Sequence, residues 1–420
     1  MLIEFSVENF MSIRDKVTLS LLAGKETENI ENVILNEKNN ILKSVAIYGA
    51  NASGKSNIFK AITAAIILIR TSNSRQVNDK LLNIVPFKFD EKSKNKPSKF
   101  EFIFEINNTR YVYGFSADIN QIYDEYLYQY LSAKPTTIFE RTNVNEYEFK
   151  KDVSELEKLS KINTPNKLFL ATATAWNYDR TKEPFMWFAN NIDTFNSNVD
   201  FQNQAFDMFD NDINGDLKRF TLNLLKEAEI NIDNYEIQKE EISAEKLALM
   251  FPDPMIKNII SNNNANFKGV GRNVFTSHNV NNTKYILNMA EESLGTQKIF
   301  YLSPLLMDTL SKGKIIIIDE IEKSLHTSLV RYIIKLFHNP EVNKNNAQLV
   351  FNTHDTNLLK LDIFRRDQIY FVEKDFSNAT TDLYSLDEFS VRKNENIEKG
   401  YLQGRYGAIP AVGLGDSLWK

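Results

Sequence analysis

The stretch Gly49-Ala50-Asn51-Ala52-Ser53-Gly54-Lys55-Ser56 decides the fold of this chain. It follows the pattern Gly-x-x-x-x-Gly-Lys-Ser, in which the backbone amides of a glycine-containing loop surround phosphate groups. Residues 44–48 before it are apolar enough for a buried strand, and residues 57–62 after it begin an apolar-periodic helix. A strand, this loop and a helix N-terminus together favour an anion. We therefore predict a phosphate-binding loop for a nucleoside triphosphate.

Each polar position of the loop has a predicted role. The ammonium of Lys55 reaches the β- and γ-phosphates, and the hydroxyl of Ser56 is a ligand of Mg²⁺. The glycines allow the backbone to bend and to approach the phosphates closely. An accidental match is the alternative, but the strand before the loop and the helix after it argue against that. The predicted nucleotide contacts are Gly49, Asn51, Ser53, Gly54, Lys55, Ser56 and Asn57, with ATP and Mg²⁺ as the ligands.

Composition excludes several other classes of protein. A length of 420 residues suggests two or three domains, and 42% hydrophobic with 25% charged residues is ordinary for a globular protein. The net charge of -5 argues against a generally cationic nucleic-acid binder, but not against a local basic site. The absence of cysteine excludes disulfides and thiolate metal sites. No apolar run reaches the ~20 residues of a membrane span, and the N-terminus is unlike a signal peptide. We expect a cytoplasmic protein with no membrane partner.

An acidic pair follows a wholly apolar strand in the last third of the chain. Residues 314–318 are a lysine and four isoleucines, and Asp319 and Glu320 come next. A carboxylate at the end of a core strand can hold Mg²⁺, as the Walker-B aspartate does, and Glu320 is then placed to act as general base on an attacking water. The alternative is two acids that end a strand in solvent, which the run of isoleucines disfavours. The apolar runs 348–354 and 368–372 add further parallel strands.

The chain changes character twice between these two motifs. Residues 100–106 and 111–115 alternate aromatic and polar side chains around the loop 107–110, which predicts a hairpin with one face in the core. Core packing explains these aromatics better than base stacking does. Residues 175–285 combine helical spacing with asparagine-rich stretches, so we expect a mainly helical insertion with a flexible tract at about 252–282. The predicted domains are the N-terminal half of an ATPase head (1–174), this insertion (175–285) and the C-terminal half of the head (286–420).

The long separation between Lys55 and Asp319 resembles the ABC-type ATPase heads of the SMC/Rad50 group, which carry a large insertion at this point. Such heads have a signature loop shortly before the Walker-B strand. Residues 292–298, Glu-Ser-Leu-Gly-Thr-Gln-Lys, look like a variant of it. A serine, a glycine and free amides at a helix N-terminus suit a γ-phosphate, although alone the segment is a plain helix cap. The resemblance assigns Ser293, Gly295, Thr296 and Gln297 to ATP bound by a second subunit.

Two further segments match such heads in the expected order. Residues 322–326 resemble the D-loop, and Thr353-His354-Asp355 resembles the switch segment, in which the imidazole of His354 contacts the γ-phosphate. A lone histidine is more often a packed or surface residue, but its place after an apolar strand favours the functional reading. Such heads usually also have a strand whose glutamine contacts Mg²⁺. Residues 167–172 are an apolar run about where that strand is expected, but they contain no glutamine. The role of the glutamine therefore stays unassigned. The residues that the resemblance assigns to the D-loop are Ser324, Leu325 and His326. The resemblance also implies a homodimer that closes over two ATP molecules, and it leaves higher oligomers open.

Four segments, two of them near the ends of the chain, narrow the resemblance to one group of bacterial ATPases. Residues 2–14, 48–57, 319–326 and 404–410 resemble the bacterial AAA-family ATPases of the abortive-infection and RloA type. The similarity spans nearly the whole chain and is weakest in the insertion 175–285. It implies a role in anti-phage defence with a separately encoded effector, such as a small RloB-like nuclease.

Three functions from different classes follow. The first is an ATPase sensor or scaffold of a defence complex, and the second is an SMC/Rad50-like DNA-binding ATPase in DNA repair or chromosome maintenance. The third is a transporter ATPase, which the strand-rich N-terminal part argues against. The segment after His354 is shorter than the ~100 residues of a typical additional domain, so we expect no intrinsic nuclease. The predicted fold class is α/β, a P-loop NTPase of ABC-ATPase head type with a mixed sheet, an antiparallel β subdomain and a mainly helical insertion.

Overall fold

The computed structural model describes residues 1–36, 38–195, 198–243, 268–392 and 395–409. The chain divides into two compact units. Unit 1 contains both ends of the chain, Met1–Ser197 and Asp308–Lys420, and unit 2 is the segment Asn198–Met307. The division therefore differs from the boundaries expected at 174/175 and 285/286, because unit 2 begins later and includes the signature segment.

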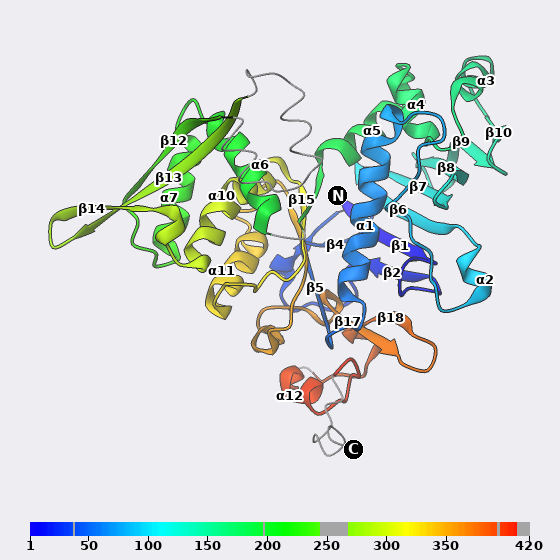
Figure 1. Ribbon diagram of the computed structural model, residues 1–420. Helices are drawn as coiled ribbons and strands as arrows, with labels where there is room; N and C mark the ends of the chain where they lie inside the picture. Colours follow the sequence, from blue (N-terminus) through cyan, green and yellow to red (C-terminus); the bar gives the residue numbers. More distant parts are fainter. Residues whose placement is uncertain (37, 196–197, 244–267, 393–394, 410–420) are drawn as a thin grey trace, which may run out of the picture. The chain divides into compact units, whose positions relative to one another are not determined.

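A six-stranded sheet in unit 1 carries the phosphate-binding loop (Figure 1). Its order is β11-β15-β16-β5-β17-β18, in which the first five strands are parallel neighbours and β18 is antiparallel to β17. Burial on both faces explains the uninterrupted apolar runs predicted here as parallel strands, and the prediction is confirmed. The bounds are β5 Ser44–Gly49, β11 Ile192–Phe195, β15 Ile315–Ile318, β16 Gln348–Asn352, β17 Ile369–Asp375 and β18 Thr380–Ser385.

A seven-stranded antiparallel sheet forms the second layer of unit 1, in the order β10-β9-β8-β7-β6-β1-β2. The predicted aromatic hairpin is confirmed as β6 and β7, and its aromatics lie in the core. Phe104 stacks on Trp187 with ring centroids 4.2 Å apart, and Phe102 meets Phe188 edge-on at 5.1 Å. The bounds are β1 Leu2–Glu8, β2 Val17–Ser20, β6 Ser98–Ile106, β7 Thr109–Ala117, β8 Ile122–Tyr130, β9 Thr136–Thr142 and β10 Glu146–Glu148, with a separate pair β3 Val33–Ile34 and β4 Ile41–Leu42.

Helix α1, Lys55–Thr71, packs between these two sheets, against β1 on one side and β5 and β11 on the other. Its sequence is apolar nearly all round, as a helix covered on both sides requires. It begins directly after Gly54, so its first amides open toward the phosphate-binding loop. The other helices of unit 1 are α2 Glu91–Lys94, α3 Val153–Ile162, α4 Phe169–Ala175, α5 Asp179–Asn190, α11 Thr327–His338 and α12 Ile397–Leu402.

Residues 167–172, expected as a strand, instead lead into helix α4. The first amides of this helix, those of Phe169 and Leu170, donate to the carboxylate of Glu125 at 2.5 and 2.9 Å. Glu125 is fully buried on β8 and pairs with the buried Arg141 at 3.7 Å. A short apolar run fits a buried helix as well as a buried strand. Here a carboxylate from a distant strand satisfies the helix N-terminus and stabilises the helix.

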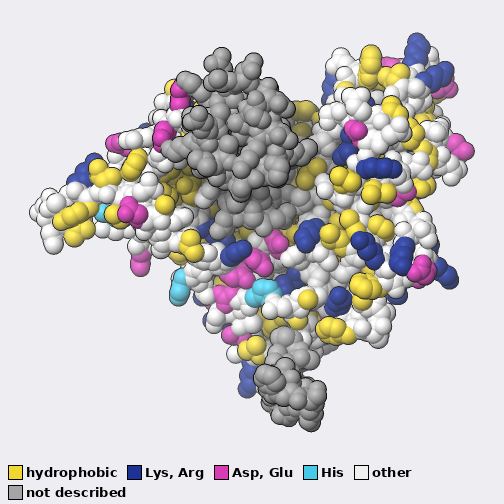
Figure 2. Space-filling model, viewed as in Figure 1, with side chains coloured by type: hydrophobic (Ala, Val, Ile, Leu, Met, Phe, Trp, Pro, Cys, Tyr) yellow, Lys and Arg dark blue, Asp and Glu magenta, His cyan; other side chains and the backbone are white. Residues whose placement is uncertain are grey.

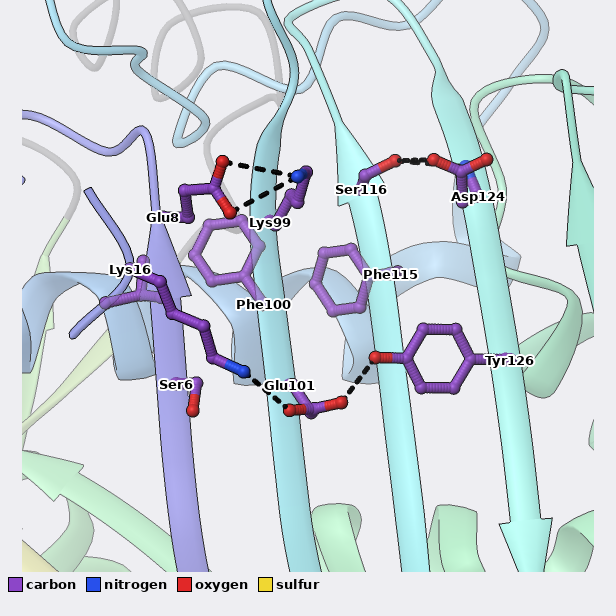
Figure 3. Close-up of a pocket in the computed structure, with 11 residues that line it drawn as sticks. Ser6, Glu8, Lys16, Lys99, Phe100, Glu101, Phe115, Ser116, Asp124 and Tyr126 are labelled. Carbon is purple, nitrogen blue, oxygen red and sulfur yellow. Dashed lines mark hydrogen bonds and ion pairs between the residues drawn. The ribbon is translucent and has the colours of Figure 1, made fainter. Parts of the chain in front are cut away.

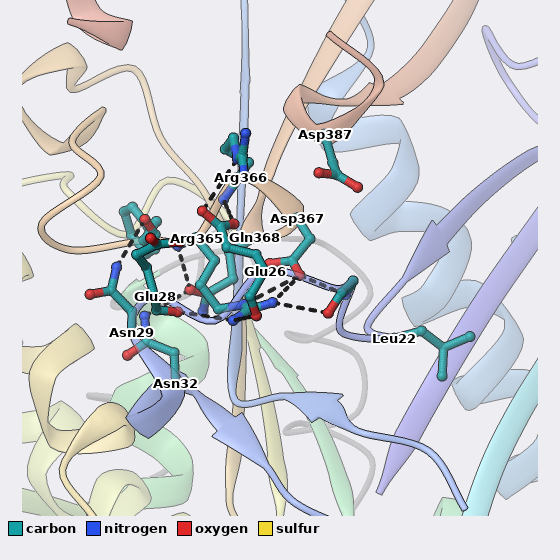
Figure 4. A network of polar contacts seen from close by, with 12 residues as sticks. Leu22, Glu26, Glu28, Asn29, Asn32, Arg365, Arg366, Asp367, Gln368 and Asp387 are labelled. Carbon is teal, nitrogen blue, oxygen red and sulfur yellow. Dashed lines mark hydrogen bonds and ion pairs between the residues drawn. The ribbon is translucent and has the colours of Figure 1, made fainter. Parts of the chain in front are cut away.

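A buried charged network fastens the start of β17 to the N-terminal region (Figure 4). Arg365 is 1% exposed and donates to Asp367 at 2.8 Å. The same guanidinium donates to the backbone carbonyls of Glu26 and Glu28 at 2.8 and 2.9 Å. Arg366 adds an ion pair to Glu26 at 3.2 Å. Because a buried charge must be paired and hydrogen-bonded, these contacts fasten the segment just before β17 to Glu26 and Glu28.

Unit 2 combines helices with a three-stranded antiparallel sheet in the order β12-β13-β14. The insertion therefore contains helices, as expected, and also a sheet that was not expected. The prediction of a flexible tract at about 252–282 is wrong for residues 268–282, because they form β13 and the turn after it. Residues 252–267 lie outside the described residues. Val274 and Thr276 alternate into the interior, and Asn281 and Asn282 adopt φ of 51° and 61° in the turn, which asparagine tolerates. The bounds are α6 Asn198–Asp210, α7 Asp216–Glu227, β12 Asn234–Ser243, β13 Lys268–Val280, β14 Thr283–Asn288 and α10 Leu294–Lys312, of which residues 308–312 belong to unit 1.

Candidate nucleotide-binding site

The phosphate-binding loop joins β5 to α1 and lines a cavity of about 330 Å³ in unit 1. Its two glycines are required by sterics. A Cβ on Gly49 would lie 2.4 Å from the carbonyl oxygen of Val372. Gly54 has a φ of 109°, and a Cβ there would lie 2.3 Å from the hydroxyl of Thr381. Both positions therefore exclude any side chain, as the motif requires.

Lys55 is buried in the first turn of α1 and is held by its own loop. Its ammonium donates to the carbonyl oxygens of Gly49 at 2.7 Å and Ala50 at 2.9 Å. Burial lowers the pKa of Lys55 to about 8, and the carboxylates of the segment 319–322 oppose this shift, Glu322 most strongly. A polyanion in the cavity would favour the charged form of this lysine.

The side chains of Ser56 and Asp319 are in contact at one edge of the sheet. The parallel order of β15, β16 and β5 brings their carboxyl ends to one edge, and the hydroxyl of Ser56 donates to Oδ1 of Asp319 at 3.2 Å. Neighbouring oxygen ligands of an octahedral Mg²⁺ ion, each ~2.1 Å from the metal, are about 3 Å apart. These two side chains therefore fit a shared Mg²⁺.

Asn352, which sequence reasoning missed, holds the acidic pair in place. It is the last residue of β16, and its Oδ1 accepts the backbone amide of Glu320 at 2.6 Å while its Nδ2 donates to Oδ1 of Asp319. Glu320 has a φ of 54°, a conformation that glutamate rarely adopts, and it lines the cavity. The position of Asn352, a polar residue at the carboxyl end of an apolar strand, is the signal that could have revealed it.

His354 lines the same cavity as Lys55 and Ser56. The residue is exposed, yet partial burial of the ring and then the charge of Lys55 lower the pKa of His354 below its ordinary value. The ring is therefore mainly neutral at pH 7, with one nitrogen able to donate and one able to accept. Its backbone amide donates to Oε1 of Glu322 at 2.7 Å.

Residues far apart in sequence hold the phosphate-binding loop through hydrogen bonds. The hydroxyl of Thr381 donates to the carbonyl oxygen of Ser53 at 2.9 Å and lies 2.7 Å from the hydroxyl of Ser12. Asn57, predicted as a nucleotide contact, donates to Ser12 at 2.7 Å while lining the cavity. Lys374 of β17 adds a second lysine to the cavity. No pattern in the sequence marks Ser12, Thr381 or Lys374, because only the sheet order brings them here.

The predicted D-loop residues Ser324, Leu325 and His326 form the turn that leads into α11. Ser324 has a φ of 64°, and Nδ1 of His326 accepts the amide of Ser328 at 3.2 Å, which caps the helix. The hydroxyl of Thr327 donates to the carboxylate of Asp355, next to His354. The turn is therefore tied to the switch segment by side chains on both.

The predicted signature residues lie in unit 2, at the start of α10. The hydroxyl of Ser293 accepts the amide of Thr296 at 3.1 Å, so the expected helix cap is present. Ser293 is exposed, and Leu294 is 65% exposed. The side chain of Gln297 donates to the carbonyl oxygen of Glu292 at 2.9 Å. The segment thus presents a capped helix N-terminus and an apolar side chain to solvent.

A second pocket lies on the antiparallel sheet (Figure 3). Its polar side chains bind one another: Glu101 accepts from Lys16 at 3.2 Å and from Tyr126 at 2.6 Å. Lys99 likewise pairs with Glu8 at 3.2 Å. The carboxylates of Glu101 and Glu8 are thus each paired with a lysine. Figure 2 shows acidic, basic and histidine side chains close together on one face of the molecule.

A phosphate-binding loop between a parallel strand and a buried helix, with an acidic pair at the same sheet edge, defines a P-loop nucleoside triphosphatase. The family model described as "AAA domain, putative AbiEii toxin, Type IV TA system" matches residues 44–360. The chain belongs to this AAA family of ATPases, AAA_21, as its sequence resemblance implied.

Solved structures similar to this chain include heads of SMC proteins. The SMC head domain from Thermotoga maritima is 11% identical with a TM-score of 0.41, covering 91% of this chain and 98% of that one. The Smc head domain with an extended coiled coil, bound to the C-terminal domain of ScpA and derived from Pyrococcus furiosus, is 12% identical with a TM-score of 0.42, covering 91% and 96%. No curated relative matches the sequence. Among the described helices, none has the length and apolar character needed to cross a membrane.

Proposed function

We propose that this protein hydrolyses ATP in the presence of Mg²⁺ and uses the bound nucleotide to join two copies of itself. The observation that carries the proposal is the convergence of five predicted residues on one region: Lys55, Ser56, Glu320 and His354 line the cavity, and Asp319 is hydrogen-bonded to Ser56. Lysine, hydroxyl, carboxylate and imidazole groups at one edge of a parallel sheet are the groups that phosphoryl transfer to water uses.

Each residue has a part in the proposed reaction. The loop amides and Lys55 bind the triphosphate. Ser56 and Asp319 would hold Mg²⁺, which would supply positive charge to stabilise the transferring phosphoryl group. Glu320 orients and polarises the attacking water, a general-base role that suits a carboxylate lining the same cavity as Lys55 and Ser56. The neutral ring of His354 donates a hydrogen bond to the same phosphate.

The proposed dimer places Ser293 and Gly295 of one copy against ATP bound by the other. The capped helix start with an exposed serine and leucine supports this, because free amides favour an anion and an exposed apolar residue favours a protein contact. ATP would then stabilise the closed dimer through its differential affinity, and hydrolysis would release it.

The proposed biological role is that of a sensor or scaffold in anti-phage defence, with the effector encoded separately. The family description, which mentions a type IV toxin–antitoxin system, supports this setting. We propose a nuclease of the RloB-like kind as the effector and no nuclease activity of the ATPase itself. The test is phage plating on cells that carry the gene with its native neighbour: protection lost with Lys55→Ala supports the role, and unchanged protection contradicts it.

The biochemical proposal is tested with purified variants. Glu320→Gln should bind ATP and form a dimer in light scattering, but release phosphate at less than roughly a hundredth of the normal rate. Lys55→Ala should lose ATP binding and remain without ATP-dependent dimer. Glu341→Gln, an exposed glutamate away from the cavity, is the control with the same charge change.

Two outcomes would contradict the proposal. Normal phosphate release by Glu320→Gln would reject the general-base role. Salt-dependent DNA binding that ATP stimulates, without a defence phenotype, would favour the SMC/Rad50-like alternative.

A further inference from the structure

The residue before the signature serine is fastened to the sheet of unit 2. Oε1 of Glu292 accepts a hydrogen bond from the hydroxyl of Thr276 at 2.5 Å and lies 2.8 Å from Nε2 of His278. Thr276 is fully buried, and the side chains of His278 and Glu292 are 17% and 10% exposed. Hydrogen bonds to a carboxylate shielded from water are stronger than neutral ones, so β13 holds Glu292 firmly.

A second tie closes the turn between β14 and the signature. The turn is a single 3-10 turn, Met289–Glu291, preceded by Asn288. Oδ1 of Asn288 accepts the amide of Ala290 at 2.9 Å, and the carboxylate of Glu291 accepts the amide of Asn288 at 2.7 Å. This reciprocal capping box fixes the angle at which the chain leaves the hairpin of β13 and β14 and enters α10 (Figure 1).

Helix α10 holds the same residue from the other side. The side chain of Gln297 donates to the carbonyl oxygen of Glu292 at 2.9 Å, and the amide of Thr296 donates to the hydroxyl of Ser293 at 3.1 Å. The backbone of residues 292–296 is therefore fixed at both ends. Ser293 and Leu294 nevertheless stay exposed, which leaves this rigid segment accessible to a partner.

We propose that Thr276 and His278 are positioning residues for the signature. They hold Glu292 so that Ser293 and Gly295 meet the γ-phosphate of ATP bound by a second copy of the chain. This inference rests on the proposed function, because it assumes that the signature acts on another copy. Neither residue touches nucleotide. They restrict the backbone of residues 292–296 before the second copy binds, so dimer formation loses less conformational entropy.

The test introduces Thr276→Val and His278→Ala, each separately, into the Glu320→Gln protein, which keeps ATP bound. ATP affinity of the single subunit should change by less than about two-fold, because the cavity in unit 1 is untouched. The ATP-dependent dimer should dissociate roughly ten-fold more readily, the factor expected when a hydrogen bond to a charged acceptor is lost. With Glu320 restored, kcat should fall similarly while KM for ATP stays nearly constant.

The controls separate positioning from folding. His278→Gln keeps a side-chain donor and should recover most of the dimer affinity. Asn273→Ala is the matched control: it removes a hydrogen bond from the same strand to the carboxylate of Glu240, 3.2 Å away, with no link to Glu292. It should leave the dimer and kcat unchanged.

The outcomes distinguish this inference from the proposed function. If Ser293→Ala weakens the dimer but Thr276→Val and His278→Ala do not, the positioning role is overturned and the signature role stands. If Ser293→Ala itself has no effect on the dimer, the proposed function fails at the signature. Loss of ATP binding in Thr276→Val or His278→Ala would indicate a purely structural role and would also overturn the inference.

Discussion

The backbone amide of His354 donates to Oε1 of Glu322 at 2.7 Å, which joins the segment after β16 to the segment after β15. The other carboxylate oxygen of Glu322 is buried and has no hydrogen-bond partner within the described part of the chain, and the same holds for the hydroxyl of Tyr48. Burial raises the pKa of Tyr48 well above its ordinary value, and the charges of Asp355 and Glu322 add to this. Of the neighbouring carboxylates, Glu322 most strongly opposes the lowering of the pKa of Lys55 by burial.

ATP affinity should fall as the pH rises through about 8. In the free protein burial lowers the pKa of Lys55 to about 8, so the ammonium loses its proton above that pH, whereas the bound triphosphate keeps it charged. Binding then takes up a proton, and the dissociation constant should rise by up to ~10-fold per pH unit above the midpoint. Titration calorimetry in two buffers of different ionisation enthalpy measures that uptake. Lys55→Arg stays charged, and its weaker binding should be independent of pH between 7 and 9, roughly the range where lysine titrates here.

Glu322→Gln should move that midpoint to lower pH. Among the carboxylates that favour the charged form of Lys55, Glu322 has the largest effect, so its neutralisation lowers the pKa of Lys55 further. The amide keeps an oxygen for the backbone amide of His354, which limits structural change. Glu341→Gln, the exposed control, should leave the midpoint in place. An identical pH profile for Glu322→Gln and the unsubstituted protein would show that this charge does not reach Lys55.

Asn352→Ala should lower kcat by roughly 10- to 100-fold with little change in ATP affinity, the cost typical of losing a group that orients a metal ligand. Its amide holds Asp319 and the backbone of Glu320 in their positions. A double-mutant cycle with Glu320→Gln checks the cause. If Asn352 acts through Glu320, the second substitution adds almost nothing to the first. Fully additive losses would contradict the link.

The predicted site residues that the structure brings together lie in continuous motifs. Asp319, Glu320 and His354 follow the carboxyl ends of apolar strands, and Lys55 and Ser56 follow the loop after another. Parallel strands bring such positions to one edge of the sheet. Supporting residues escaped prediction because their roles depend on contacts between segments far apart in the chain, as when Thr381 reaches Ser53.

Two elements of the fold escaped for a similar reason. Helix α4 is capped by Glu125 from a distant strand, so the local apolar run could not distinguish helix from strand. Strand β13 is rich in polar residues on its exposed face, which resembles a loop until Val274 and Thr276 are seen to alternate into the interior. In both cases tertiary contacts overrode a weak local preference.

Glu125→Ala should destabilise the protein by about 3–5 kcal/mol, because it leaves a buried arginine without its anion and the first turn of α4 without its acceptor. Arg141 and Glu125 have fully buried side chains, and Tyr113 donates to the same carboxylate at 3.0 Å. The change should appear as a lower urea midpoint with an unchanged slope. Glu8→Ala, which breaks the exposed pair with Lys99 on the same sheet, should cost no more than about 1 kcal/mol. Equal losses for the two variants would mean that burial of the Glu125 carboxylate contributes nothing to stability.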